Sequence, residues 1–416
     1  MLGAGCRCFK IGVSVFRDFN PETSGDISAE PGFPNPALSA SILPRAAYIH
    51  IPFCRAKCCY CDFNSYPGLE HLFEDYVESL ILEIGVAEPT GAPLESVYFG
   101  GGTPTILPAS ALARILDAVR DRFGLAGGAE ITVEANPGTV DAPGLALLRA
   151  AGFNRLSIGV QSFDDRVLSR LGRVHTSGQA RDGFRLGRDA GFENIGIDLM
   201  YGLPGQSVSE WERTLESALG LAPEHVSLYE LSIEEGTVFG NLRRASLLDL
   251  PDEDAQIEMY LTAINALAAA GYEHYEMSNL ALPGRRSRHN QTYWRNEPYF
   301  GFGAGASGCV AGVRYTNLRR PEDYIESTRA TGSAVESSEA LTGRQAMGET
   351  IMLGLRMIEG VDLGAFRERF GVELAEVYGR ELGEPAARGL VELTETRLRL
   401  SEAGLLIANE VAAEFL

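Results

Sequence analysis

Two patterns of apolar residues alternate along residues 45–270. Short runs rich in β-branched and aromatic residues predict six strands: Tyr48–Ile51, Ser96–Phe99, Glu130–Glu134, Arg155–Val160, Asn194–Met200 and His225–Leu231. Longer segments with apolar residues at three- and four-residue steps predict six helices: Leu72–Val86, Ala109–Phe123, Leu145–Ala151, Ser177–Ala190, Ser209–Leu219 and Asp252–Ala270. Six β/α units in a row predict parallel strands joined by right-handed crossovers.

Polar and glycine-rich residues lie at the ends of these predicted strands. They include Gly100–Thr105 after the second strand, Glu134–Pro137 after the third, Gln161 and Ser162 after the fourth, and Asp198 within the fifth. Such a chain forms either a partial barrel related to the TIM barrel or a doubly wound open sheet. Both folds place active groups at the carboxyl ends of their strands, so we expect a functional site there.

The pattern changes after about residue 280, where Arg, Asn, aromatic residues and Gly become frequent. The last segment predicts helices at Arg344–Met357, Leu363–Phe370 and Leu374–Leu382, a hairpin of Leu390–Leu393 with Arg397–Leu400, and a helix from Ser401 to about Ala413. Helices followed by a two-stranded wing indicate a small winged-helix-like α+β domain. We therefore expect a poorly ordered extension (1–43), a barrel core (44–284), a connecting region (285–339) and this accessory domain (340–416).

Composition narrows the classes of function. The 416 residues are 45% hydrophobic and 22% charged, which is typical of a globular protein. With 36 Lys and Arg against 56 Asp and Glu, the net charge of −20 argues against nucleic-acid and anionic-membrane partners. The acidic tail argues equally against DNA binding by the accessory domain. Because no run of about 18 apolar residues and no signal-peptide pattern occurs, we expect no membrane span and a reducing, cytoplasmic setting.

Four of the seven cysteines lie within eight residues: Cys54, Cys58, Cys59 and Cys61. An odd and bunched set is unlike a secreted disulfide framework. The C-x3-C-x2-C spacing of Cys54, Cys58 and Cys61 allows three thiolates to hold three irons of a [4Fe-4S] cluster, which leaves the fourth iron open. The alternatives are a structural zinc site, with Cys59, His50 or Cys309 as fourth ligand, and a reactive cysteine. The spacing assigns no role to Cys6 and Cys8.

The cysteine motif resembles the signature of radical S-adenosylmethionine (radical SAM) proteins. Further segments are similar to the oxygen-independent coproporphyrinogen III oxidase-like group of that superfamily, in the same order over about residues 45–410. These segments are Tyr48-Ile-His-Ile-Pro-Phe-Cys, Tyr98-Phe-Gly-Gly-Gly-Thr-Pro-Thr, Glu134-Ala-Asn-Pro, Ser157-Ile-Gly-Val-Gln-Ser-Phe and Ile197-Asp-Leu-Met-Tyr-Gly-Leu-Pro. The group contains oxidases and heme chaperones of the HemW type.

The resemblance implies a partial (β/α)6 barrel of the radical SAM type, with a cluster held by Cys54, Cys58 and Cys61. The amine and carboxylate of SAM would chelate the open iron. Backbone N–H groups of a glycine loop would meet the amino-acid end of SAM, at Gly101, Gly102 and Thr103. Four further positions match SAM-contacting residues of the family: Glu134, Gln161, Arg173 and Asp198. Three more candidates surround the same pocket: Tyr48, Tyr60 and Ser232.

Two features resemble the heme-chaperone branch of the group. Phe63 stands where the oxidases usually carry a further cysteine, and His289-Asn-Gln-Thr-Tyr-Trp is similar to the motif associated with heme binding in the chaperones. A neutral imidazole can ligate heme iron, and arginines can pair with propionates. The arginines beside His289 are Arg285, Arg286, Arg288 and Arg295. The resemblance thus implies heme as a further ligand and heme-acceptor proteins as partners.

Other interpretations stay open at this point. The chain could instead be an oxidase that decarboxylates coproporphyrinogen III to protoporphyrinogen IX, or a zinc-stabilised barrel. The Arg-rich segment could simply close the barrel mouth, with His289 satisfied by a hydrogen bond. Ser307 replaces a histidine frequent in relatives, and Gly303-x-Gly305-x-x-Gly308 fits a dinucleotide-binding pattern but lacks the βαβ unit around it. A homodimer and peripheral contact with respiratory proteins also stay open.

Overall fold

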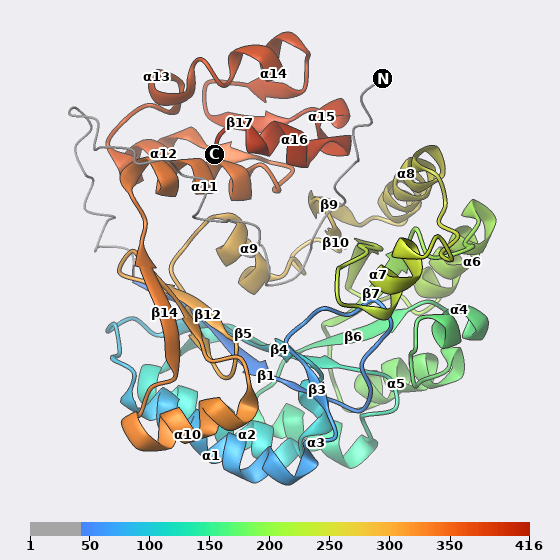
Figure 1. The fold of residues 1–416 in the computed structure, drawn as a ribbon, viewed down its shortest axis with the longest axis vertical. Coiled ribbons are helices and arrows are strands. Elements are labelled where there is room, and N and C mark those ends of the chain that lie inside the picture. The colour runs from blue at the N-terminus through green and yellow to red at the C-terminus, as the bar shows by residue number, and fades with distance from the viewer. Residues whose placement is uncertain (1–42) are drawn as a thin grey trace.

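The computed structural model describes residues 43–416, so the extension expected at 1–43, with Cys6 and Cys8, lies almost wholly outside the described residues. Within them, the main sheet has nine strands in the order β11-β1-β4-β5-β6-β7-β8-β10-β9 (Figure 1). Its six central strands are parallel and follow chain order: β1 (Ala46–Ile51), β4 (Leu94–Gly101), β5 (Leu125–Ala135), β6 (Arg155–Gln161), β7 (Ile195–Tyr201) and β8 (His225–Glu230). Since the order never reverses, the sheet winds as a partial barrel, which confirms the barrel prediction over the doubly wound sheet.

Short strands complete the two edges of this sheet. Strand β11 (Phe300–Phe302) pairs in parallel with β1, whereas β10 (Asn279–Ala281) pairs antiparallel with β8 and then with β9 (Glu273–Glu276). The covering helices are α1 (Phe73–Val86), α2 (Ala109–Phe123), α3 (Ala142–Ala151), α5 (Ser177–Asp189), α6 (Val208–Leu219) and α8 (Glu253–Ala269). All six predicted helices are therefore confirmed within about three residues.

Side chains alternate between the two faces of the barrel strands. On β4, Val97 and Phe99 are fully buried in the core under the helices, whereas Ser96 and Tyr98 lie on the opposite face. The same alternation puts polar groups such as Glu134 and Arg155 inside the barrel. The apolar core thus lies between sheet and helices, and the barrel interior is lined with polar side chains.

Local sequence signals fix several helix starts. Thr176 and Ser207 are the N-cap residues of α5 and α6, and each forms a capping box. The N-cap side chain accepts from the backbone N–H three residues later, and the side chain of that residue, Gln179 or Glu210, accepts from the N-cap backbone N–H. Short elements join the larger ones: β2 (Phe53–Cys54), β3 (Tyr66–Pro67), η2 (Glu70–Leu72), η3 (Pro104–Ile106), α4 (Asp165–Arg170) and α7 (Val238–Arg244). These short elements carry much of the candidate site.

The connecting region contains more structure than its composition predicted. It holds α9 (Arg288–Trp294), α10 (Pro321–Thr331) and an antiparallel sheet of β12 (Ser307–Val310), β13 (Val313–Asn317) and β14 (Val335–Ala340). Helix α10 packs on α1, and α9 lies between the barrel and the C-terminal domain (Figure 1).

The C-terminal domain has its own core, which includes Ile351, Phe366 and Leu398. Its elements are α11 (Gly343–Gly354), β15 (Val361–Asp362), α12 (Leu363–Phe370), α13 (Leu374–Tyr378), α14 (Gly383–Ala387), β16 (Val391–Leu393), β17 (Arg397–Leu400), α15 (Glu402–Leu406) and α16 (Ala408–Ala413). The wing thus gains a third strand, the helix expected over Leu374–Leu382 ends early, and the last helix breaks at Ile407, whose φ of −127° and ψ of 33° are not helical. Among residues 43–416 no helix is both long and apolar enough to cross a membrane.

Candidate cluster and SAM site

The cysteine loop, residues 54–64, begins where β1 continues into the short strand β2. Cys54 ends β2, and the N–H of Cys61 donates to the carbonyl of Cys58 at 3.2 Å, which closes a tight turn. Two hydrogen bonds hold the backbone of Cys59. Its N–H donates to the carbonyl of Leu171 at 2.9 Å, and its carbonyl accepts from the N–H of Phe239 at 2.9 Å. Its side chain packs among the apolar residues of that neighbourhood.

The other three thiols lie close enough to influence one another. Burial raises the pKa of the Cys61 thiol to about 11, and the charges of Cys58 and Cys54 add to the rise. Burial also raises the pKa of Cys54, with Cys58 contributing. Such thiols ionise readily only when a positive centre compensates them, which is what the irons of a cluster do. In the described part of the chain no group of three Cys, His, Asp or Glu side chains is close enough to bind a single metal ion. A [4Fe-4S] cluster does not need such a group, because each thiolate binds a different iron. The donor set therefore fits a cluster.

A chain of hydrogen bonds connects two of these cysteines. The hydroxyl of Thr103 lies 3.6 Å from the sulfur of Cys54 and accepts from Nδ2 of Asn136 at 2.7 Å. Oδ1 of Asn136 accepts from Arg173 at 2.5 Å, and the guanidinium reaches the sulfur of Cys58 at 3.6 Å. Arg173 also donates to the carbonyl of Gly159 at 2.6 Å, so its charge is held beside the cysteine loop.

The glycine loop after β4 packs against the cysteine loop without room for side chains. The N–H groups of Gly102 and Thr103 donate to the carbonyls of Ile51 and Phe53, both at 2.8 Å. A Cβ on Gly102 would lie 2.5 Å from the carbonyl oxygen of Phe53. Gly101 has a φ of +112°, and a Cβ there would lie 2.5 Å from the ring of His50. Glycine is therefore required for this close approach. The expectation that the N–H groups of Gly101, Gly102 and Thr103 meet SAM is wrong, because all three donate hydrogen bonds within the protein.

Two acidic side chains extend the site into the barrel. Glu134 accepts from the hydroxyl of Tyr98 at 2.7 Å and from the N–H of Gly101 at 3.3 Å. Burial raises the pKa of Glu134 to about 7, and the charge of Asp198 adds to the rise. Burial likewise raises the pKa of Asp198, which accepts from Ser157 at 3.4 Å. Both oxygens of Glu134 therefore already accept a hydrogen bond from the protein.

The remaining predicted residues differ in their placement. Gln161 ends β6 in the left-handed region, with a φ of 64°, and its buried Oε1 has no hydrogen-bond partner in the protein. Burial raises the pKa of Tyr60, which lies beside Cys58 on the loop. Ser232 follows β8 and is half-buried. Tyr48 lies deeper, in the middle of β1, with its hydroxyl 3.1 Å from Nδ1 of His50.

His289 lies at the other end of the barrel. Its Nδ1 is 2.9 Å from the hydroxyl of Ser96, in the amino-terminal half of β4, and its backbone N–H donates to Glu130 at 3.2 Å. Its Nε2 is 2.8 Å from the hydroxyl of Tyr293, and the side chain is 1% exposed. Burial lowers the pKa of His289 to about 3, and the charge of Arg155 adds to the effect. The histidine motif and the cysteine loop thus occupy opposite ends of the strands.

The arginines near His289 are partly engaged by acidic residues. Arg286 pairs with Glu273 at 3.1 Å, and Arg295 lies 3.7 Å from Glu359 of the C-terminal domain. Arg288 donates to the carbonyl of Gly128 at 3.1 Å.

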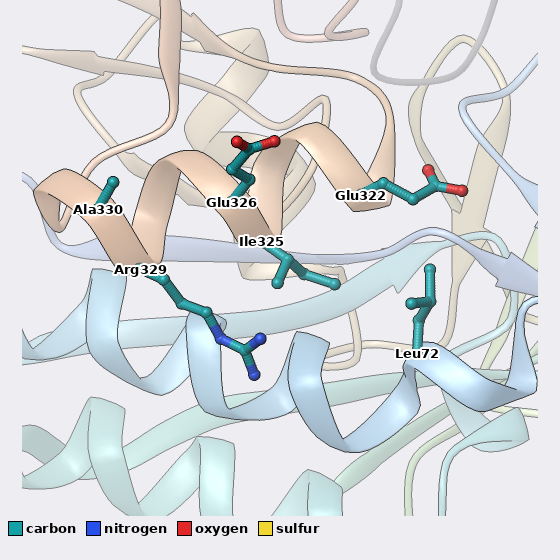
Figure 2. Close-up of a pocket in the computed structure, with 6 residues that line it drawn as sticks. All are labelled: Leu72, Glu322, Ile325, Glu326, Arg329 and Ala330. Atoms are coloured by element: carbon teal, nitrogen blue, oxygen red, sulfur yellow. The ribbon is translucent and has the colours of Figure 1, made fainter.

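An open groove on the outside of the barrel contains none of the predicted site residues. It lies between α1 and α10, and its lining residues are Leu72, Glu322, Ile325, Glu326, Arg329 and Ala330 (Figure 2). Arg329 pairs there with Asp75 at 2.5 Å, which joins the two helices.

Comparison with known proteins agrees with this geometry. The Radical SAM superfamily model matches residues 48–218, and the HemN C-terminal domain model matches residues 341–407. The chain is 40% identical over 375 residues to "Heme chaperone HemW" of Bacillus subtilis, covering 89% of this chain and 99% of that protein. It is 38% identical over 381 residues to the Escherichia coli protein of the same name, covering 90% and 98%. The chain belongs to the HemW family.

The fold of this HemW-family chain is also that of a solved radical SAM enzyme. The structure of coproporphyrinogen III oxidase (HemN) from Escherichia coli superposes with a TM-score of 0.79 at 25% identity, covering 91% of this chain and 92% of that one. Both the resemblance and the fold class expected from the sequence are therefore confirmed. A radical SAM protein uses a [4Fe-4S] cluster and SAM, so the family supports the cluster interpretation over zinc.

Sequence reasoning missed two residues that organise this HemW-family site. Asn136 joins Thr103 to Arg173, and Tyr98 holds Glu134. Both stand inside motifs quoted for the resemblance, so their proximity to the strand ends was the available signal. Their partners could be assigned only from the structure.

Proposed function

We propose that this protein is a heme chaperone that binds a [4Fe-4S] cluster and SAM at the carboxyl ends of the barrel strands, binds heme near α9, and passes heme to acceptor proteins. The observation that carries this proposal is the identity of 40% to a protein named as a heme chaperone, over 99% of that protein's length. We further propose a reducing, cytoplasmic setting, because the odd and bunched set of cysteines is unlike a secreted disulfide framework.

In this proposal Cys54, Cys58 and Cys61 hold the cluster, and the glycine loop with Glu134, Gln161, Arg173 and Asp198 holds SAM. Reduction of a bound cluster lets radical SAM proteins cleave SAM. The protein's own contribution is positional: Thr103, Asn136 and Arg173 fix the cysteine loop and the glycine loop relative to each other. Tyr48, Tyr60 and Ser232 complete the proposed surroundings.

We propose that His289 would ligate heme iron. Its lowered pKa keeps the ring neutral at physiological pH, and the neutral ring is the form that ligates iron. Ligation through Nε2 requires the hydroxyl of Tyr293 to leave that nitrogen, and because both residues are on α9, the Tyr293 side chain must rotate away from His289 when heme binds. Arg286 and Arg295 would then exchange Glu273 and Glu359 for propionates.

The competing function is coproporphyrinogen III oxidation, which the likeness to HemN favours. Phe63 argues against it, since this side chain is 43% exposed where the oxidases usually have a further cysteine.

The test is anaerobic reconstitution with iron and sulfide, followed by heme titration and a coproporphyrinogen turnover assay on the same sample. We expect a brown protein that binds heme without turnover. His289→Ala should weaken heme binding at least tenfold, whereas the exposed His71→Ala should not. Tyr293→Phe, which frees Nε2, should bind heme at least as tightly as the wild type. Substantial turnover, or full heme affinity in His289→Ala, would refute the assignment.

A further inference from the structure

A layer of stacked rings lies inside the barrel between its two ends. The rings of Tyr98 and His289 stack at a centroid distance of 5.1 Å and an interplanar angle of 26°. Tyr48 lies beside both, at 6.2 Å from Tyr98 and 6.4 Å from His289. Tyr48 and His289 are 2% and 1% exposed, so a change in one ring position is transmitted by contact to the next.

Tyr98 connects this layer to the glycine loop. Its hydroxyl donates to Oε1 of Glu134 at 2.7 Å, and Oε2 of the same carboxylate accepts from the N–H of Gly101 at 3.3 Å. The space around this bond is tight, because a Cβ on Gly100 would lie 2.9 Å from Tyr98 and 3.1 Å from Glu134. A ligand that draws Glu134 toward itself therefore also pulls on the hydroxyl of Tyr98 through this hydrogen bond.

A second route leads from the same layer to the cysteine loop. The hydroxyl of Tyr48 lies 3.1 Å from Nδ1 of His50, and Nε2 of His50 lies 2.9 Å from the carbonyl oxygen of Asn64. Asn64 follows Cys61 by three residues. Both routes leave the ring layer at residues of β1 and β4 and end at the two loops of the candidate site.

From this geometry we propose that Tyr98 couples the SAM site to the heme site, so that occupancy of one end of the barrel changes the affinity of the other. Tyr98 is a positioning residue in this scheme: it acts on SAM through Glu134 and on heme through the ring of His289. The inference rests on the proposed function, since it needs both ligands to bind. Because coupling between two binding sites is reciprocal, each ligand must change the affinity of the other by the same factor.

The test uses the full-length, anaerobically reconstituted protein. Heme dissociation constants are measured with and without saturating SAM, and SAM dissociation constants with and without heme. We expect the two ratios to agree and to be about fivefold or larger, the lower end for coupled sites. In Tyr98→Phe the ring and its stacking are kept and only the hydroxyl is lost. Both ligands should still bind, but each ratio should fall clearly toward one, because only the route through Tyr48 and His50 remains, and a purely structural role of Tyr98 would not produce this change.

Tyr229→Phe is the matched control. Tyr229 on β8 is a second, partly buried tyrosine near Asp198, so Tyr229→Phe tests the loss of a hydroxyl near the same acidic groups. We expect its ratios to stay at the wild-type value. The coupling proposal is overturned if SAM does not change the heme affinity of the wild type, or if Tyr98→Phe keeps the wild-type ratios. The proposed function survives both results. Failure of the wild type to bind heme at all overturns the proposed function, and the coupling with it.

Discussion

Replacing Glu83 with Gln should remove a pH-dependent cost of folding. Glu83 on α1 is buried, and its carboxylate accepts from the N–H of Gly303 at 2.8 Å, from Nδ2 of Asn317 at 2.6 Å and from the hydroxyl of Tyr324 at 2.6 Å. Burial outweighs these donors and raises the pKa of Glu83 to about 7, from an ordinary value of 4.5. The residue matters to the site because Gly303 precedes Ala304, whose carbonyl accepts from Asn64 on the cysteine loop at 2.9 Å.

The free energy of unfolding falls with rising pH because the folded state binds the Glu83 proton more tightly than the unfolded state does. A carboxyl whose pKa is higher in the folded state contributes stability that is present below about pH 4.5 and is lost as the pH rises through 7. At about 1.4 kcal/mol per pKa unit, the whole difference corresponds to about 3 kcal/mol. Between pH 5 and pH 8 the loss is about 2.5 kcal/mol, because part of it has occurred by pH 5.

The assay is anaerobic chemical denaturation of the cofactor-free protein, in reductant, at several pH values from 5 to 8. We expect the free energy of unfolding of Glu83→Gln, minus that of the wild type, to rise by about 2.5 kcal/mol over this range. Taking the difference cancels the contributions of other buried groups. Glu78→Gln, an exposed glutamate on the same helix, should give a difference that stays flat within about 0.5 kcal/mol. A flat difference for Glu83→Gln would refute the reasoning.

Three further substitutions test the site. Gly102→Ala should lower the free energy of unfolding by about 1–3 kcal/mol in thermal melts, because its Cβ would lie 2.5 Å from a carbonyl oxygen of β2. Gly127→Ala, whose Cβ would have nothing within 4 Å, should not lower it. Equal melting temperatures of the two variants would contradict this prediction. Cys58→Ser should lose iron after reconstitution while Cys59→Ser keeps it, and equal iron contents would exclude the proposed ligand set. Asn136→Ala should weaken SAM binding about tenfold in equilibrium dialysis, because it removes the hydrogen bonds to Thr103 and Arg173. An unchanged affinity would show that these two residues keep their positions without Asn136.

The barrel could be predicted because each of its elements has a local signal. The apolar alternation in strands such as Arg155–Val160 and the three- and four-residue steps of Ala109–Phe123 are set by the neighbours each residue meets within its own element. The connecting region lacks such signals. Strand β14 reads Val-Glu-Ser-Ser-Glu-Ala and is exposed along its whole length, so no apolar face marks it. Its pairing with β13 is formed by backbone groups, which composition does not report.

The candidate site divides in the same way. The cysteines and the glycine loop could be located because each motif is continuous and follows a predicted strand. The position of His289 could not, because its contacts with Ser96 and Glu130 join residues 193 and 159 positions apart in the chain. Asn136 shows the same limit on a smaller scale: its place in a motif was visible, but its role between Thr103 and Arg173 depends on three strands being brought together.

The separation between the two ends of β4 bears on what kind of chemistry the chain can do. Ser96 and Gly101 are five residues apart on one strand, which at about 3.4 Å per residue is a distance of about 17 Å. A radical abstracts hydrogen only from an atom it touches, and the rings of Tyr48, Tyr98 and His289 fill the barrel between these two ends, so a porphyrin bound on the far side of His289 would not touch a radical generated beside the glycine loop. The ring layer would then protect the cargo from the reactive species made in the same molecule, and a protein built this way could carry a tetrapyrrole without altering it.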